Sequence, residues 1–170
     1  YIKRTPVSEY AAQGKGGMGK KGITTREEDY VTDVFTASTH DHILFFTDTG
    51  KVYRKKGYQI PESGKTAKGT NIVNILQVEQ GERIQTMIHT RDIEHGENRF
   101  LFMVTRAGTV TRLPVITLKN LRSNGIRALR MEEGDALIAV HETDGTENIV
   151  IATHDEQAVC FRETDVPAMG

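Results

Sequence analysis

The eight residues TDTGKVYR (47–54) recur as TRAGTVTR (105–112). Both stretches follow the pattern T-x-x-G-x-V-x-R, in which two β-forming runs meet at a turn that contains glycine. Such a turn between runs rich in Val, Ile, Thr and aromatic residues predicts a β-hairpin. Because the pattern recurs, we expect the fold to be built from repeated units.

Two weaker copies extend the repeat toward both ends of the chain. THDEQAVC (153–160) has Glu156 in place of the glycine, and YIKR (1–4) is similar to KVYR (51–54). The spacings between successive copies are 50, 58 and 48 residues. The last position of the pattern therefore falls at Arg4, Arg54, Arg112 and Cys160.

Two further markers recur in phase with these hairpins. An acidic turn precedes a strand-like run in EEDYV (27–31), GERI (81–84) and GDAL (134–137). A glycine precedes an apolar run at Gly69 and Gly125, with Gly22 as a candidate first copy. About four short strands per unit are typical of one blade in a propeller-like ring. We therefore expect an all-β fold of stacked blades, since one blade cannot bury both of its faces.

The composition is that of a globular domain. Hydrophobic residues make up 37% of the chain and charged residues 26%. The longest apolar runs are far too short to cross a bilayer. The single cysteine, Cys160, excludes an internal disulfide framework, and we expect it to be buried as a small apolar residue. Because the sequence begins within a β-like run, we interpret residues 1–170 as one partial domain cut from a longer protein.

The charge is distributed unevenly, although the net charge is only −1. Residues 1–70 hold 12 Lys and Arg against 8 Asp and Glu, whereas residues 71–170 hold 10 against 15. Structural roles explain the Thr, Gly and Val of the repeat, but we interpret the recurring arginine differently. One basic cluster per blade would form a stripe that matches the regular charges of a DNA backbone.

Several long segments, in order and in phase, resemble the C-terminal domains of the DNA gyrase A protein and of its relative, the topoisomerase IV C protein. The resemblance covers essentially the whole chain, and it is carried by YIKRTPVSEY, EEDYV, ASTHDHILFFT, GKVYRKKGYQIPE, TAKGTNIVNILQVEQGE, SNGIRAL and EEGDALIAV. It implies a β-pinwheel, a ring of about six four-stranded blades that exchange strands. This chain would hold about three blades plus partial ends.

The resemblance also implies a function. Domains of this family bind duplex DNA around their rim and bend it, within a bacterial ATP-driven type IIA topoisomerase that introduces negative supercoils. The expected partners are duplex DNA, the remainder of the gyrase A protein and the gyrase B protein, in the cytoplasm and away from membranes. Because the DNA-cleaving tyrosine and the ATP and Mg²⁺ sites of the family lie elsewhere, no catalytic residue, metal or cofactor is expected in this chain.

The glycine-rich stretch AAQGKGGMGKKG (11–22) is similar to a seven-residue family box, Q-R-R-G-G-R-G, over Gln13–Gly19. Lys15 keeps one of the three positive charges of the box without the planar fork of arginine. Gly14 and Met18 stand where the other two arginines are expected, and Lys20 and Lys21 follow directly. Glycines allow a phosphate to approach the backbone closely, and lysines neutralise it.

The predicted DNA contacts comprise this stretch and the basic residues of the repeat and of the SGKTAKG loop (63–69). They are Arg4, Gln13, Lys15, Gly16, Gly17, Gly19, Lys20, Lys21, Lys51, Arg54, Lys55, Lys56, Lys65, Lys68, Arg106 and Arg112.

Other interpretations of the same residues remain open at the level of sequence. A nucleotide-binding loop at residues 11–22 would need Ser or Thr where Lys21 stands. The same residues are also compatible with a flexible linker. Residues 63–69 are equally compatible with a polar loop between blades. His40 and His42 flank Asp41, but a metal site needs further ligands, so a surface turn is the better interpretation. The alternative function is a propeller-like protein-interaction module, without a nucleic-acid partner, that binds through the acidic half.

Overall fold

A computed structural model of the chain describes residues 1–10, 16–19, 23, 30–94 and 98–169. Within those ranges the regular elements are β-strands and 3-10 helices of three or four residues, which confirms the prediction of an all-β fold. None of the described helices is long and apolar enough to span a membrane. The strands are β1 (His42–Thr47), β2 (Lys51–Lys56), β3 (Ile84–Thr90), β4 (Phe100–Thr105), β5 (Val110–Pro114), β6 (Ile126–Arg127), β7 (Leu137–Thr143), β8 (Asn148–Ala152) and β9 (Ala158–Arg162). The 3-10 helices are η1 (Val7–Glu9), η2 (Gly57–Gln59), η3 (Ile72–Asn74), η4 (Val115–Leu118) and η5 (Glu163–Asp165).

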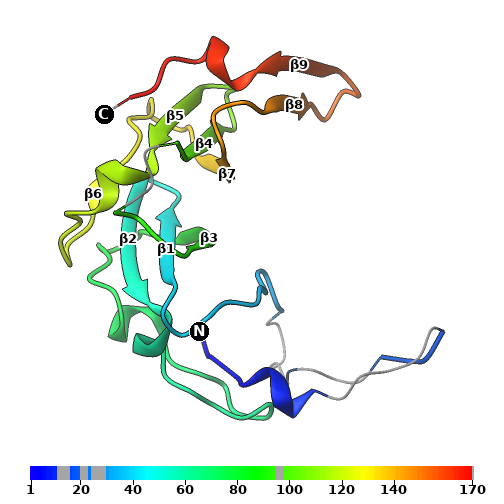
Figure 1. Cartoon of the computed structure of the whole chain (residues 1–170), viewed down its shortest axis with the longest axis vertical. Coiled ribbons are helices and arrows are strands. Elements are labelled where there is room, and N and C mark those ends of the chain that lie inside the picture. The colour runs from blue at the N-terminus through cyan, green and yellow to red at the C-terminus, as the bar shows by residue number, and fades with distance from the viewer. Residues whose placement is uncertain (11–15, 20–22, 24–29, 95–97, 170) are drawn as a thin grey trace.

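The strands form three antiparallel sheets that follow one another along an arc (Figure 1). The sheets have the strand orders β3-β1-β2-β6, β5-β4-β7 and β8-β9. Each is centred on one predicted hairpin, and the three hairpins share one register, since Leu44 pairs with Arg54, Phe102 with Arg112 and Val150 with Cys160. One edge strand of each of the first two sheets comes from the segment that directly precedes the next hairpin. This strand is β3 in the first sheet and β7 in the second.

The hairpin turns show why the repeat carries glycine. Gly50 and Gly108 both have a positive φ, of 88° and 90°, which a residue with a Cβ atom adopts at a cost. The third turn reaches the same region with Glu156, whose φ of 63° is the one positive value among the non-glycine residues that the structure describes. The third copy of the repeat therefore keeps the shape of the turn without its glycine.

The recurring Gly69 and Gly125 mark places where one blade touches the next. A Cβ atom on Gly69 would lie 2.5 Å from the carbonyl oxygen of Ile2, and one on Gly125 would lie 2.8 Å from that of Val52. Both glycines also have a positive φ. The glycine marker is thus explained by close backbone approach between successive repeats.

The acidic turns hold the hairpin turn that lies beside them. Asp135 accepts a hydrogen bond from the amide of Ala107 at 3.0 Å, and Glu82 accepts one from the hydroxyl of Thr49 at 3.3 Å. A hydrogen bond from the Thr105 side chain is the largest of the interactions that lower the pKa of Asp135. At these two turns the second marker is therefore structural, whereas the acidic residues of its first copy, 27–29, lie outside the described residues.

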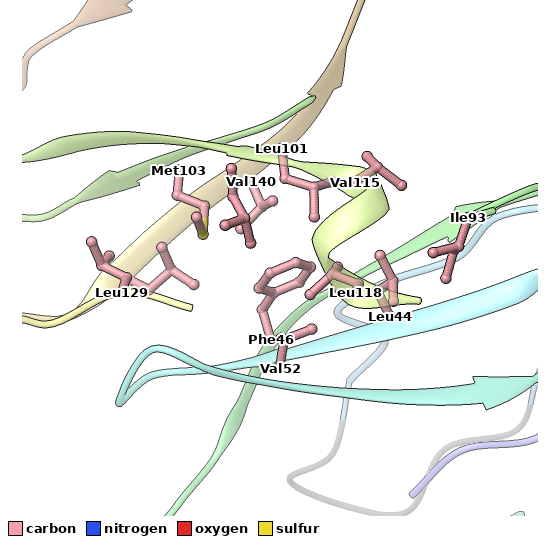
Figure 2. Close-up of a cluster of buried hydrophobic side chains, with 12 residues drawn as sticks. Leu44, Phe46, Val52, Ile93, Leu101, Met103, Val115, Leu118, Leu129 and Val140 are labelled. Atoms are coloured by element: carbon pink, nitrogen blue, oxygen red, sulfur yellow. The ribbon is translucent and has the colours of Figure 1, made fainter. Parts of the chain in front are cut away.

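The main core lies between the first and second sheets (Figure 2). Phe46 and Val52 of the first sheet pack there with Leu101 and Met103 of β4. Burial of these apolar side chains is the main force that holds successive blades together. Cys160, which we expected to be buried, is instead exposed on β9, because the third sheet has a much thinner apolar cover.

Candidate nucleic-acid interface

The three arginines of the repeat bind backbone carbonyls of the following blade. The guanidinium of Arg4 donates to Ile60 at 3.0 Å, that of Arg54 to Leu118 at 3.0 Å, and that of Arg112 to Val166 at 3.0 Å. Each acceptor lies at the end of, or directly after, the 3-10 helix that follows the next hairpin of the repeat. We call these three contacts the arginine staples.

Arg112 is the most enclosed of the three. The residue is 9% exposed and pairs with Glu163, which is fully buried, at 3.4 Å. Its guanidinium also lies 4.4 Å from the ring centroid of Phe100. The recurring arginine therefore has a structural role that the sequence did not reveal: all three arginines join blades, and Arg112 is largely enclosed by the protein.

The other predicted basic residues are exposed to varying degrees, and several of them contact neighbouring acidic or aromatic side chains. Burial lowers the pKa of Lys51, but its interactions with Glu79, at 3.1 Å, and with Tyr53 together outweigh burial, so that the pKa of Lys51 is raised. In the SGKTAKG loop, the ammonium groups of Lys65 and Lys68 lie over the rings of Tyr10 and Tyr1, 4.5 Å and 3.6 Å from the centroids. Arg106 is exposed at the second hairpin turn. These side chains keep their charge near the surface.

Basic residues of two blades converge on one hollow of about 220 Å³. Arg54, Lys55 and Lys56 reach it from β2, and Arg122 reaches it from the loop between η4 and β6. The other lining residues are His42, Gln59, Leu121 and Ser123. Among the described residues that line this hollow there is no carboxylate, so the field of these residues attracts anions.

Arg122 and Ser123 were missed from the sequence. They lie in the loop KNLRSNG (119–125), which ends at the recurring glycine Gly125. The predicted basic loop SGKTAKG (63–69) ends in the same way at Gly69. Comparing the two loops across the repeat could have identified them. That the later loop lies beside β2 depends on the contact between Gly125 and Val52, which the sequence alone does not reveal.

His42 belongs to this basic hollow, and not to a surface turn. It is the first residue of β1, and its Nε2 atom lies 3.1 Å from the ammonium of Lys56, which also donates to the carbonyl of His40. Burial, followed by the charges of Lys56 and Arg54, lowers the pKa of His42. The imidazole is therefore neutral near pH 7 and accepts a hydrogen bond from Lys56.

The glycine-rich stretch is described only in part. Gln13, Lys15, Lys20 and Lys21 lie outside the described residues, so their predicted roles stay predictions. The segment 16–19 is exposed, and Gly16 has a φ of 75°. A Cβ atom on Gly16 or Gly19 would meet no atom of the described residues within 4 Å.

In the described part of the chain, one group of three potential metal ligands gathers, namely Asp144, Glu147 and Glu163, each with an oxygen atom within 4.8 Å of the others. Glu163 already accepts hydrogen bonds from the hydroxyl of Thr143 and the amide of Glu147, both at 2.8 Å, and pairs with Arg112. Its oxygens are thus satisfied by the protein, and we assign this cluster to the joint between the second and third sheets.

Comparisons of the sequence with known proteins agree on one family. Residues 1–38, 41–91 and 99–144 match the family described as "DNA gyrase C-terminal domain, beta-propeller". The chain is 45% identical to the DNA gyrase A protein of Halalkalibacterium halodurans and 46% identical to that of Streptococcus pyogenes serotype M1, in each case over all 170 residues. It spans 20% of the length of each of these relatives.

Solved structures show the same architecture. The C-terminal domain of a DNA topoisomerase IV superposes with a TM-score of 0.79 at 27% identity, over 100% of this chain and 51% of that one. A DNA gyrase A C-terminal domain superposes with a TM-score of 0.78 at 21% identity, over 99% of this chain and 53% of that one.

Proposed function

This chain belongs to the family of DNA gyrase C-terminal domains, and from that premise we propose that it binds duplex DNA and bends it without reading its sequence. Contacts to phosphates position a protein on DNA but carry no sequence information, so a surface of lysines and arginines suits this task. Bending then requires several such contacts spread along a curved surface, and the sheets of this chain follow an arc (Figure 1).

The observation that carries the proposal is the basic hollow between the first two blades. Lys55 and Lys56 come from β2, and Arg122 comes from a loop more than sixty residues later in the sequence. None of the described lining residues is a carboxylate that would repel a phosphate. Phosphates recur along each DNA strand, so further contacts on neighbouring blades would extend the same path. The half-buried Lys65 and Lys68 and the exposed Arg106 are candidates for such contacts.

The proposal extends to the protein of which such a domain is a part. The relatives are DNA gyrase A proteins, and this chain corresponds to one fifth of their length. We propose that DNA bound on this chain is presented to the remainder of a gyrase A protein and to the gyrase B protein, in a bacterial cytoplasm. The strand passage that introduces negative supercoils, with its ATP and Mg²⁺, would take place on those other parts.

The test is a binding titration of duplex DNA at several salt concentrations, with a bending readout on a fragment of about 150 base pairs, one persistence length. A double variant, Lys55→Gln with Arg122→Gln, removes two positive charges from the hollow. Each lost phosphate contact should lower the slope of log K against log salt by about 0.9, so we expect a decrease of about 1.8.

A matched control removes charge elsewhere. Arg130→Gln changes an exposed arginine that is not part of the hollow, and it should leave the slope within experimental error of the unchanged chain. Equal slopes for the double variant and the control would contradict the assignment of the hollow. Absence of DNA binding at low salt would contradict the proposed function itself.

A further inference from the structure

We propose that His42, on the wall of the basic hollow, takes up a proton when a DNA phosphate enters, so that DNA binding is coupled to pH. The proposal rests on the function proposed above and assigns a role to a residue that the comparison of repeats did not single out. Its ligand is a phosphodiester of duplex DNA.

One edge of the His42 imidazole ring is buried in the protein, and the other edge lines the hollow. Its Nδ1 atom is buried and has no hydrogen-bond partner among the residues described. Its Nε2 atom faces the ammonium of Lys56 at 3.1 Å. Because an ammonium can only donate, Nε2 must accept, and the proton of the neutral ring then sits on Nδ1. Any further proton can therefore bind only at Nε2, against Lys56.

The charges that face His42 come from three places. Lys56 and Arg54 on β2 oppose protonation, whereas Asp41, directly before β1, and Asp92, after β3, favour it. The opposite residue on β3 is Thr90, which is neutral. Lys55 and Arg122, which also line the hollow, add positive charge. Without an anion, burial and these cations together keep the ring neutral, and the pKa of His42 lies below its usual value.

A phosphate in the hollow would reverse this balance. Its negative charge offsets Lys56 and Arg54, and its oxygens accept hydrogen bonds from any donor nearby. Lys56 can then turn its ammonium from Nε2 toward the phosphate, and Nε2 takes a proton from the solvent and donates it in a second hydrogen bond. Binding therefore raises the pKa of His42, and by reciprocity a lower pH strengthens binding.

The experiment compares DNA affinity between about pH 5.5 and about pH 8, where histidine titrates, at constant ionic strength. If binding raises the pKa of His42 by about one unit, affinity should be about tenfold higher below the lower of the two pKa values than above the higher one. His42→Asn should remove this factor, because the amide oxygen still accepts from Lys56 but binds no proton. His154→Asn, at a histidine whose side chain is fully exposed at the β8–β9 turn, is the matched control.

Two further measurements keep the test independent of how the variant folds. Calorimetry of the unchanged chain in two buffers with different ionisation enthalpies should show proton uptake on binding. NMR titration of the His42 ring should give a higher pKa with DNA than without it. Two outcomes would overturn this inference while leaving the proposed function intact. One is DNA binding with the same pH dependence in His42→Asn as in the unchanged chain, and the other is DNA binding that leaves the pKa of His42 unchanged. No DNA binding at any pH would instead overturn the proposed function and this inference with it.

Discussion

The three hairpin turns of the repeat reach one backbone conformation with different residues. Gly50 and Gly108 have nearly equal φ values of 88° and 90°, and Glu156 adopts 63°. An L-residue in this region costs about 1–2 kcal/mol of conformational energy. The third hairpin carries this cost in its own turn, whereas the first two avoid it. The turn geometry is therefore set by the fold, and glycine only lowers its energy.

Gly50 and Gly108 offer a matched pair of substitutions. A Cβ atom on Gly50 would overlap the carbonyl oxygen of Leu129, whereas one on Gly108 would meet nothing within 4 Å. Gly108→Ala should cost about 1 kcal/mol, from the positive φ alone. Gly50→Ala should cost at least about 1 kcal/mol more, because the backbone of Leu129 must also move. Urea unfolding of both variants measures the difference, and equal losses would mean that the contact with Leu129 is not rigid.

At the scale of elements, the arginine staples join blades by different means. Arg54 donates to two carbonyls at a partly exposed site, at 3.0 Å and 3.2 Å. Arg112 donates to one carbonyl and also pairs with the buried Glu163. A buried carboxylate that loses its cation costs far more than a carbonyl that can turn to water. The joint of the second and third sheets is thus more sensitive to the loss of its arginine than the joint that Arg54 makes.

We expect Arg112→Met to destabilise the chain by about 3–5 kcal/mol, because it removes the cation that pairs with the buried Glu163. Arg54→Met should cost only about 1 kcal/mol, the usual net value of a hydrogen bond. Equilibrium unfolding in urea measures both. Adding Glu163→Gln to Arg112→Met should restore part of the lost free energy of unfolding. If the double variant is no more stable than Arg112→Met, Arg112 stabilises the chain by packing against Phe100 rather than by its charge.

The hairpins and the glycine and acidic markers could be predicted because they are local signals that repeat in phase. The partners of the arginines could not, since Arg54 and its acceptor Leu118 are 64 residues apart and meet only when blades stack. Basic residues in a repeat are equally compatible with ligand contacts and with structural donors. His42 was misjudged for the same reason: its strand and its neighbour Lys56 become apparent only once β1 pairs with β2.

At the scale of the whole molecule, the three sheets differ in how much they bury. Leu44 and Phe102, at equivalent places in the first two hairpins, are 0% and 2% exposed, whereas Val150 in the third is 68% exposed. Within the described part of the chain, β8 pairs only with β9. Two-stranded sheets with little apolar cover are marginally stable in water. Stability is therefore graded along the arc.

Native-state hydrogen exchange should reveal this gradient. We expect the amides of β8 and β9 to exchange by local opening, with protection well below that of β1 and β4, which are buried in the centres of their sheets. The comparison needs no variant, because the equivalent positions of the repeat serve as internal controls. Uniform protection across the three hairpins would indicate one cooperative unit instead.

The arginine staples also bear on how such a chain is made. Arg4, Arg54 and Arg112 find their acceptors 56, 64 and 54 residues further along the sequence. A ribosome adds about 5–20 residues per second, so each staple must wait roughly 3 to 13 s after its arginine is synthesised. During that interval a finished hairpin stands beside the ribosome without its neighbour. Blade assembly during translation would then proceed one step behind synthesis, with the most recent hairpin always the exposed one.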